Sequence, residues 1–245
     1  MEKRLFVFDF DYTLINNNTD TWVMGLRPEL CLRERLRELR RQFPCWTDLM
    51  DHVFAELHQA GCWRREMLEH MGRLEVYNQA LKALKAVSEC EWADAIIISD
   101  SNSVFIEHIL KRCSVGSVAT EVFTNPAYFD ESGRLHVQRF HSHNCPTCVD
   151  SPNMCKGIIL RRFLNRQQYG SVVYVGDGKG DYCPSVSSMK EKDIIICRQG
   201  YSLEKKLANV ETDVIASVYH VNFEESLGDF LISHCLQQDS KAVKD

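Results

Sequence analysis

The sequence has little of what defines fibrous, membrane or nucleic-acid-binding proteins. It contains 12 glycines and 6 prolines among 245 residues, which excludes collagen-like and low-complexity chains. Apolar runs such as Leu5–Phe8 and Ala95–Ile98 are too short to span a bilayer, and the first is also too short for a secretory signal. The 29 Lys and Arg residues against 34 Asp and Glu residues give a net charge of −5 without a dense basic block. We therefore expect no nucleic-acid partner and no membrane span.

Cysteine, in contrast, is abundant. The count of eleven is odd and comes without an export signal, which favours reduced thiols and a cytoplasmic location over a disulfide scaffold. Cys145 and Cys148 form a Cys-x-x-Cys pair, with His143 and Cys155 close by in the chain. This spacing is compatible with a zinc site and also with a packed cluster of reduced thiols, and the sequence does not decide between them.

Apolar runs alternating with helical patterns predict an α/β protein with a doubly wound parallel sheet, which is a Rossmann-like core. Between residues 16 and 88 several segments have a helical pattern and none is a convincing strand, so we expect residues 16–88 to form a helical cap inserted into a core of residues 1–15 and 89–245. The predicted strands are residues 4–8, 95–99, 121–123, 171–175, 193–197 and 214–219, with a hairpin over 128–137. The predicted helices of the core are residues 103–112, 154–169 and 223–236, and the polar end, residues 238–245, is expected to fray.

Polar side chains follow the predicted strands at their carboxyl ends, where parallel sheets gather functional groups. They are Asp9 and Asp11, Ser99 and Asp100, and Asp177 and Asp181, together with Lys156 at a helix start. Converging carboxylates repel one another, and a hard cation with oxygen ligands such as Mg²⁺ removes the conflict. A lysine and a serine beside such a site indicate a phosphate as the ligand.

This set of residues suits phosphoryl transfer through a covalent aspartyl-phosphate intermediate. Asp9 would attack phosphorus as the nucleophile, and Asp11 would protonate the leaving group and then activate water. Three simpler interpretations stay open: Asp11 as a turn residue, Ser99 as the cap of the next helix, and Asp181 as a metal ligand or as the partner of Lys156.

The strings Asp9-Phe10-Asp11-Tyr12-Thr13, Ser99, Lys156 and Gly176-Asp177-Gly178 with Asp181 resemble, in order, the four motifs of haloacid-dehalogenase-type phosphatases. More local strings, such as Ile97–Asn102 and Asn153–Lys156, resemble the family of pyridoxal-phosphate phosphatase and phosphoethanolamine/phosphocholine phosphatase.

The resemblance implies a set of roles. It gives Asp9 and Asp11 the catalytic steps, Ser99 and Lys156 the phosphate, and Asp181 a supporting role. It assigns Mg²⁺ to Asp9, Asp177 and the backbone carbonyl of Asp11, and substrate contacts to Asp20 and Asp100.

The resemblance also ranks the substrates. Pyridoxal 5'-phosphate comes first among small phosphomonoesters, while the carboxylates of Asp20 and Asp100 would also suit the ammonium group of phosphoethanolamine or phosphocholine. A phosphotransferase and a non-catalytic protein that binds a phosphorylated ligand on the same fold stay open as functions, and the sequence does not predict the oligomeric state. One departure is Gly180, where the family usually has Asn, so the surroundings of the metal are expected to be looser.

Overall fold

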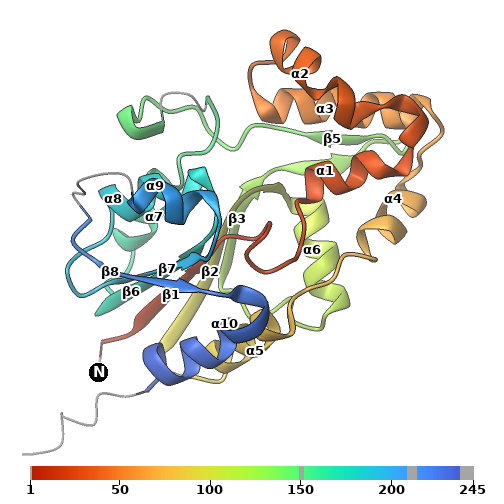
Figure 1. Ribbon diagram of the computed structural model, residues 1–245. Helices are drawn as coiled ribbons and strands as arrows, with labels where there is room; N and C mark the ends of the chain where they lie inside the picture. Colours follow the sequence, from red (N-terminus) through yellow and green to blue (C-terminus); the bar gives the residue numbers. More distant parts are fainter. Residues whose placement is uncertain (1, 149–151, 209–213, 238–245) are drawn as a thin grey trace, which may run out of the picture.

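A six-stranded parallel sheet forms the centre of the protein, described here from a computed structural model over residues 2–148, 152–208 and 214–237. The strand order is β3-β2-β1-β6-β7-β8, with β1 near the middle (Figure 1). This confirms the predicted fold class. The strands are β1 Arg4–Phe8, β2 Ala93–Asn102, β3 Glu121–Asn125, β6 Ser171–Gly176, β7 Ile194–Arg198 and β8 Ser217–Val221, and a separate hairpin pairs β4 Ala127–Phe129 with β5 Leu135–Val137.

The two faces of the sheet pack into two different apolar clusters. Along β1, Phe6 and Phe8 contribute to one cluster and Leu5 and Val7 to the other, and all four are fully buried. This alternation follows from the two-residue period of a strand. A strand buried on both faces holds its carboxyl end rigidly, and Asp9 comes next in the chain.

Helices cover both faces of the sheet. Apolar residues of α5, α6 and α10 join the cluster of Phe6 and Phe8, and those of α7 and α9 join the other cluster (Figure 1). The helices are α1 Thr19–Val23, α2 Leu32–Gln42, α3 Trp46–Gln59, α4 Arg64–Met71, α5 Asn78–Ser88, α6 Ser103–Arg112, α7 Lys156–Leu164, α8 Tyr182–Ser187, α9 Ser202–Ala208 and α10 Phe223–Phe230, which continues as a π-helical turn over Leu231–Cys235.

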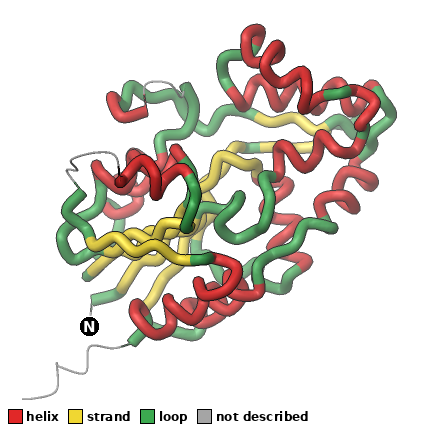
Figure 2. The backbone as a smooth tube through the Cα atoms, in the orientation of Figure 1, coloured by secondary structure: helices red, strands yellow, loops and turns green. Residues whose placement is uncertain are grey.

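Helices α1 to α4 lie away from the sheet, next to the β4–β5 hairpin (Figure 2). The chain leaves the core and returns to it at one place, where Ile15 and Val76 form an antiparallel bridge. The Tyr77 backbone N–H donates to the Leu14 carbonyl at 3.1 Å beside this bridge. Helix α5 follows the crossing and packs against α10 and β2. The division at residues 16–88 stays a prediction, and these contacts lead us to propose a cap boundary near residue 77.

Several element boundaries differ from the predicted ones. The helix expected from residue 154 begins at Lys156, because Met154 has a positive φ of 56° and Cys155 is the N-cap. Strand β2 continues to Asn102, beyond the expected end at residue 99, and β8 is shifted to residues 217–221. The expected frayed end, residues 238–245, lies outside the described residues.

Among the helices in the described ranges, none has the length and apolar character that crossing a membrane requires.

Candidate active site

Asp9 lies directly beyond the carboxyl end of β1. Its backbone N–H still donates to the Val175 carbonyl of β6 at 2.9 Å, which extends the strand pairing by one residue. The carboxylate is 5% exposed and accepts a hydrogen bond from the Phe10 backbone N–H at 2.7 Å. Burial, together with the charges of Asp181 and Asp177, raises the pKa of Asp9 well above its usual range. An aspartate in such a place needs a cation beside it in order to stay ionised.

Lys156 supplies one positive charge. It is the first residue of α7, and its Nζ lies 2.8 Å from Asp9 Oδ2 and 2.8 Å from Asp181 Oδ1. Burial alone would lower the pKa of Lys156, but Asp181 and Asp9 outweigh this and raise it. The lysine therefore stays charged between the two carboxylates.

Asp181 is fully buried and saturated with donors. Its Oδ1 accepts from Lys156 Nζ and from the Tyr174 hydroxyl at 2.7 Å. Its Oδ2 accepts from the backbone N–H groups of Asp177, at 3.2 Å, and Gly178, at 2.9 Å. Of the two interpretations of Asp181, this geometry favours the partner of Lys156, because little lone-pair capacity is left for a metal.

Asp177 is the third acid of the site and directly follows β6. Its Oδ1 accepts from Thr13 Oγ1 at 3.2 Å, and burial raises its pKa to about 7. Asp9, Asp177 and Asp181 each have one carboxylate oxygen in a common group, and these three oxygens all lie within 4.8 Å of one another. Three carboxylates with a single lysine leave an excess of negative charge, and oxygen ligands suit Mg²⁺. The residues present thus fit the Mg²⁺ ion expected from the sequence, and Asp9 and Asp177 remain its predicted side-chain ligands.

Asp11 lies beside the start of α1. Its Oδ2 accepts from Thr19 Oγ1 at 3.0 Å, and its buried Oδ1 has no partner among the described residues. Burial, then the charges of Asp20 and Asp100, raise the pKa of Asp11 well above its usual range. This environment favours the protonated carboxyl, which is the form that a general acid must carry.

Ser99 is fully buried within β2, and its Oγ accepts from the Ser101 backbone N–H at 3.3 Å. It does not cap the following helix. Asn102 does so instead, accepting from the Phe105 backbone N–H at 3.1 Å, because the strand continues for three residues beyond Ser99.

The two predicted substrate-binding acids differ in exposure. Asp20, in α1, is 5% exposed and accepts from Trp46 Nε1 at 2.6 Å. Burial raises the pKa of Asp20 to about 7. The Asp100 side chain is exposed, and its backbone carbonyl accepts from Asn125 Nδ2 at 2.6 Å. Both charges raise the pKa of Asp11, and the charge of Asp100 also raises the pKa of Asp9.

Sequence reasoning missed three residues that hold the site together. Tyr174 donates its hydroxyl to Asp181, Arg198 donates to the Tyr12 carbonyl at 2.6 Å, and Asn153 donates to Thr47 of α3 at 2.8 Å. Tyr174 and Arg198 carried a local signal. The Tyr174 hydroxyl lies inside a buried strand and needs a hydrogen-bond partner, and Arg198 lies at the carboxyl end of its strand, where functional groups gather. The Asn153 contact reaches across the fold and left no local pattern.

Two glycines of the fourth motif have different functions. A Cβ atom at Gly176 would lie 2.5 Å from Asp181 Cγ, so only glycine permits that carboxylate to pack there. A Cβ atom at Gly180 would lie 3.5 Å from Lys156 Cε, an ordinary contact. A Cβ atom at position 180 therefore has room beside the lysine, and glycine does not make this contact.

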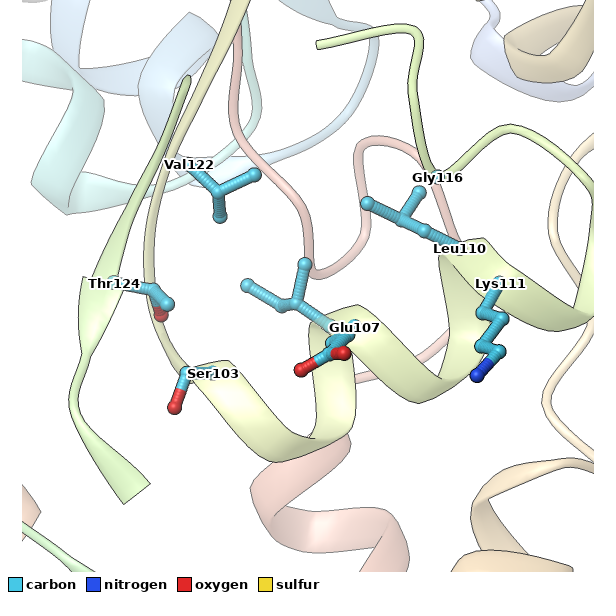
Figure 3. A pocket seen from close by; sticks show the side chains of 8 residues that line it. Ser103, Glu107, Leu110, Lys111, Gly116, Val122 and Thr124 are labelled. Carbon is cyan, nitrogen blue, oxygen red and sulfur yellow. The ribbon is translucent and has the colours of Figure 1, made fainter. Parts of the chain in front are cut away.

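A pocket of about 480 Å³ lies elsewhere, between α6 and β3 (Figure 3). Ser103, Glu107 and Thr124 are among its lining residues, and none of the predicted site residues belongs to that lining. We assign it no part in the chemistry.

Known proteins resemble the chain along nearly its whole length. The family described as "Putative Phosphatase" matches residues 4–234. A human protein named "Pyridoxal phosphate phosphatase PHOSPHO2" is 37% identical over 244 residues, which cover 95% of this chain and 97% of that protein. An Arabidopsis thaliana protein named "Inorganic pyrophosphatase 2" is 35% identical and aligns over 80% of this chain and 70% of its own length.

The fold has solved counterparts as well. A substrate-bound phosphoserine phosphatase superposes with a TM-score of 0.58 over 95% of this chain and 99% of that chain, at 15% identity. Such a distant likeness shows the fold alone. Together, the sheet, the acids beyond its strands and these relatives define a phosphatase of the haloacid-dehalogenase type. Within that class, the chain belongs to the Putative Phosphatase family.

Proposed function

We propose that the protein is a Mg²⁺-dependent phosphomonoesterase that acts through a phosphorylated Asp9. The observation that carries this proposal is the position of the Asp9 carboxylate, buried beyond β1 and held 2.8 Å from Lys156 within a group of three acids. A charged nucleophile on a rigid strand, beside a fixed cation, is suited to attack on phosphorus.

The reaction would proceed in two displacements. A carboxylate oxygen of Asp9 bonds to phosphorus while the bond to the ester oxygen breaks, and Asp11 gives its proton to that oxygen. Asp11 then removes a proton from water, which attacks the aspartyl-phosphate, releases inorganic phosphate and restores Asp9. Lys156 and Ser99 would bind the phosphate oxygens. Asp9, Asp177 and the Asp11 backbone carbonyl would hold Mg²⁺, which neutralises charge on the transferring group.

We propose pyridoxal 5'-phosphate as the substrate. The human relative whose name states this activity aligns over 97% of its own length. Asp20 and Asp100 would accept hydrogen bonds from the ring nitrogen or hydroxyl group of the substrate. Phosphoethanolamine and phosphocholine compete for the same carboxylates, and the pyrophosphatase relative adds pyrophosphate to the candidates.

The nucleophile is tested with Asp9→Asn, which keeps the shape of the side chain and removes its charge. We expect turnover to fall by several orders of magnitude with the fold retained, since covalent catalysis is lost. Phosphate release and circular dichroism measure the two effects. Asp48→Asn, at a half-exposed position of α3, is the control and should keep full activity. A variant at position 9 with more than a tenth of wild-type turnover, deamidation excluded, contradicts the mechanism.

The substrate is tested by comparing kcat/KM for pyridoxal 5'-phosphate, phosphoethanolamine, phosphocholine and pyrophosphate at one Mg²⁺ concentration. We expect pyridoxal 5'-phosphate to rank first, and Asp100→Ala to lower its kcat/KM by about tenfold, as expected for a lost hydrogen bond to a charged group. A tenfold preference for either amine or for pyrophosphate would reverse the assignment. Equal kcat/KM values for Asp100→Ala and wild type would remove Asp100 from the substrate site.

A further inference from the structure

A group of four cysteines lies outside the catalytic acids. We call it the four-cysteine cluster: Cys145, Cys148, Cys155 and Cys183. The four Sγ atoms all lie within 4.8 Å of one another. The first three come from the loop before α7 and from its N-cap, while Cys183 comes from α8 and carries no local sequence signal.

The sulfur separations have the size that a single zinc ion requires. Zn–S bonds of about 2.3 Å in a tetrahedron place the sulfur atoms about 3.8 Å apart. Three of the six separations are 3.6 Å for Cys145–Cys183, 3.8 Å for Cys148–Cys155 and 3.5 Å for Cys155–Cys183, and none exceeds 4.8 Å. These are far longer than a disulfide bond of about 2.05 Å.

The surroundings of the cluster also suit thiolates. The Ile158 backbone N–H in the first turn of α7 donates to Cys155 Sγ at 3.4 Å, and Ser187 Oγ lies 3.7 Å from Cys183 Sγ. His143 is not part of the group of ligand atoms that lie within 4.8 Å of one another, and its Nδ1 accepts from the Cys145 backbone N–H at 3.3 Å.

We propose that the four-cysteine cluster binds one structural Zn²⁺ ion. Binding displaces the thiol protons to solvent and gives a closed tetrahedral site with no position for water. Sulfur ligands select zinc here, whereas the oxygen ligands of Asp9 and Asp177 select Mg²⁺, so the two sites would hold different metals.

The place of the cluster indicates what the ion would do. Cys155 directly precedes Lys156, and Cys183 follows Asp181 by two residues. A Cβ atom at Gly157 would lie 2.8 Å from Cys183 Sγ, so the glycine lets α7 and α8 approach closely at this point. The zinc ion would fasten the start of α7 to the start of α8, and thereby hold Lys156 beside Asp181.

The test is the metal content of the full chain, purified without chelators, added zinc or a metal-affinity step. Elemental analysis should find about one zinc per chain, as a closed structural site requires. Cys148→Ser and Cys183→Ser should each retain less than a tenth of that zinc. Cys90→Ser, at a half-buried cysteine outside the cluster, is the matched control and should keep it all.

The wild type alone also decides the question, even if the variants fail to fold. Titration with a mercurial reagent should release zinc as the cluster thiols react, and cobalt substituted for zinc should show thiolate-to-metal charge-transfer bands. A wild-type zinc content near zero, with all eleven thiols reactive after denaturation or with disulfides in their place, overturns the proposal. So does full zinc retention in both cluster variants. These readouts do not use activity, so their outcome is independent of the proposed phosphatase chemistry.

Discussion

Asp20 is a buried carboxyl whose charge opposes folding. Burial raises its pKa to about 7, whereas an unfolded aspartate titrates near about 3.9. Between these values the native state binds more protons than the unfolded state, so the contribution of Asp20 to stability is lost as the pH rises from about 4 to about 7. A carboxyl kept at such a cost, close to Asp11, is what a substrate-binding role predicts.

We therefore predict that Asp20→Asn stabilises the metal-free protein more at pH 8 than at pH 4. The amide oxygen still accepts the hydrogen bond from Trp46 Nε1, so the charge alone is removed. Urea unfolding at the two pH values measures the difference. Glu69→Gln, on an exposed face of α4, should show none. Equal stabilisation by Asp20→Asn at both pH values would mean that Asp20 does not titrate in this range.

At the level of single residues, the sequence predicted the acids and the lysine but not the contacts that orient them. Strand ends identify Asp9 and Asp177, and a helix start identifies Lys156, because their positions follow from the local pattern. The sequence left two roles open for Asp181, since its four donors include Tyr174 and two backbone groups whose directions depend on the fold. The catalytic and binding roles of these residues stay predictions that the variants at positions 9 and 100 test.

Among the elements, the β4–β5 hairpin is attached to helix α3 through Asp51. Its carboxylate accepts from Arg134 Nη2 at 2.7 Å and from the Val137 backbone N–H at 3.1 Å. Asp48 on the same helix pairs with Arg139, but both side chains are 42% exposed. Asp51 therefore gives the Val137 backbone N–H a hydrogen-bond partner. The Asp48–Arg139 contact is a solvent-exposed ion pair.

We predict that Asp51→Ala lowers the free energy of unfolding by about 1–3 kcal/mol, because a backbone donor loses its partner. Asp48→Ala should change it by less than about 1 kcal/mol, as exposed ion pairs do. Thermal unfolding of both variants gives the comparison. If the two melting temperatures fall equally, the hairpin does not depend on Asp51 for its place against α3.

Longer elements were easier to predict than short ones. β1, β2, β6 and β7 were expected close to their observed positions because apolar runs define buried strands. Helices α1, α8 and α9 were not predicted; they have five to seven residues, too few to show a helical period. Helix α8 also contains Pro184, which the short helix accommodates within its first turn.

For the molecule as a whole, the cluster of acids leads us to expect that stability depends on Mg²⁺. Without a metal ion, Asp9 and Asp181 pair with the same lysine, Lys156, and Asp177 lies beside them with its pKa raised by burial and by the charge of Asp181. A ligand that binds only the native state stabilises it, by about 2.7 kcal/mol at a hundred times its Kd. The melting temperature should therefore rise with added MgCl₂.

The rise should be absent with NaCl of equal ionic strength and much smaller in Asp177→Ala, which removes one carboxylate. Differential scanning fluorimetry is sufficient to measure it. A melting temperature of the wild type that does not respond to Mg²⁺ would contradict the metal site, whatever the activity of the preparation.

The bridge between Ile15 and Val76 has a consequence for the order of folding. Strands β1 and β2 pair with Arg4 opposite Ala93, so their contact closes a long loop, and the entropy of loop closure slows such pairings. If the segment between Ile15 and Val76 folds first, the bridge holds its two ends together. The loop that β1 and β2 must then close consists only of the residues between each strand and the bridge. Early folding of the cap would thus turn a distant strand pairing into a nearly local one, and substitutions that weaken the crossing should slow assembly of the central sheet.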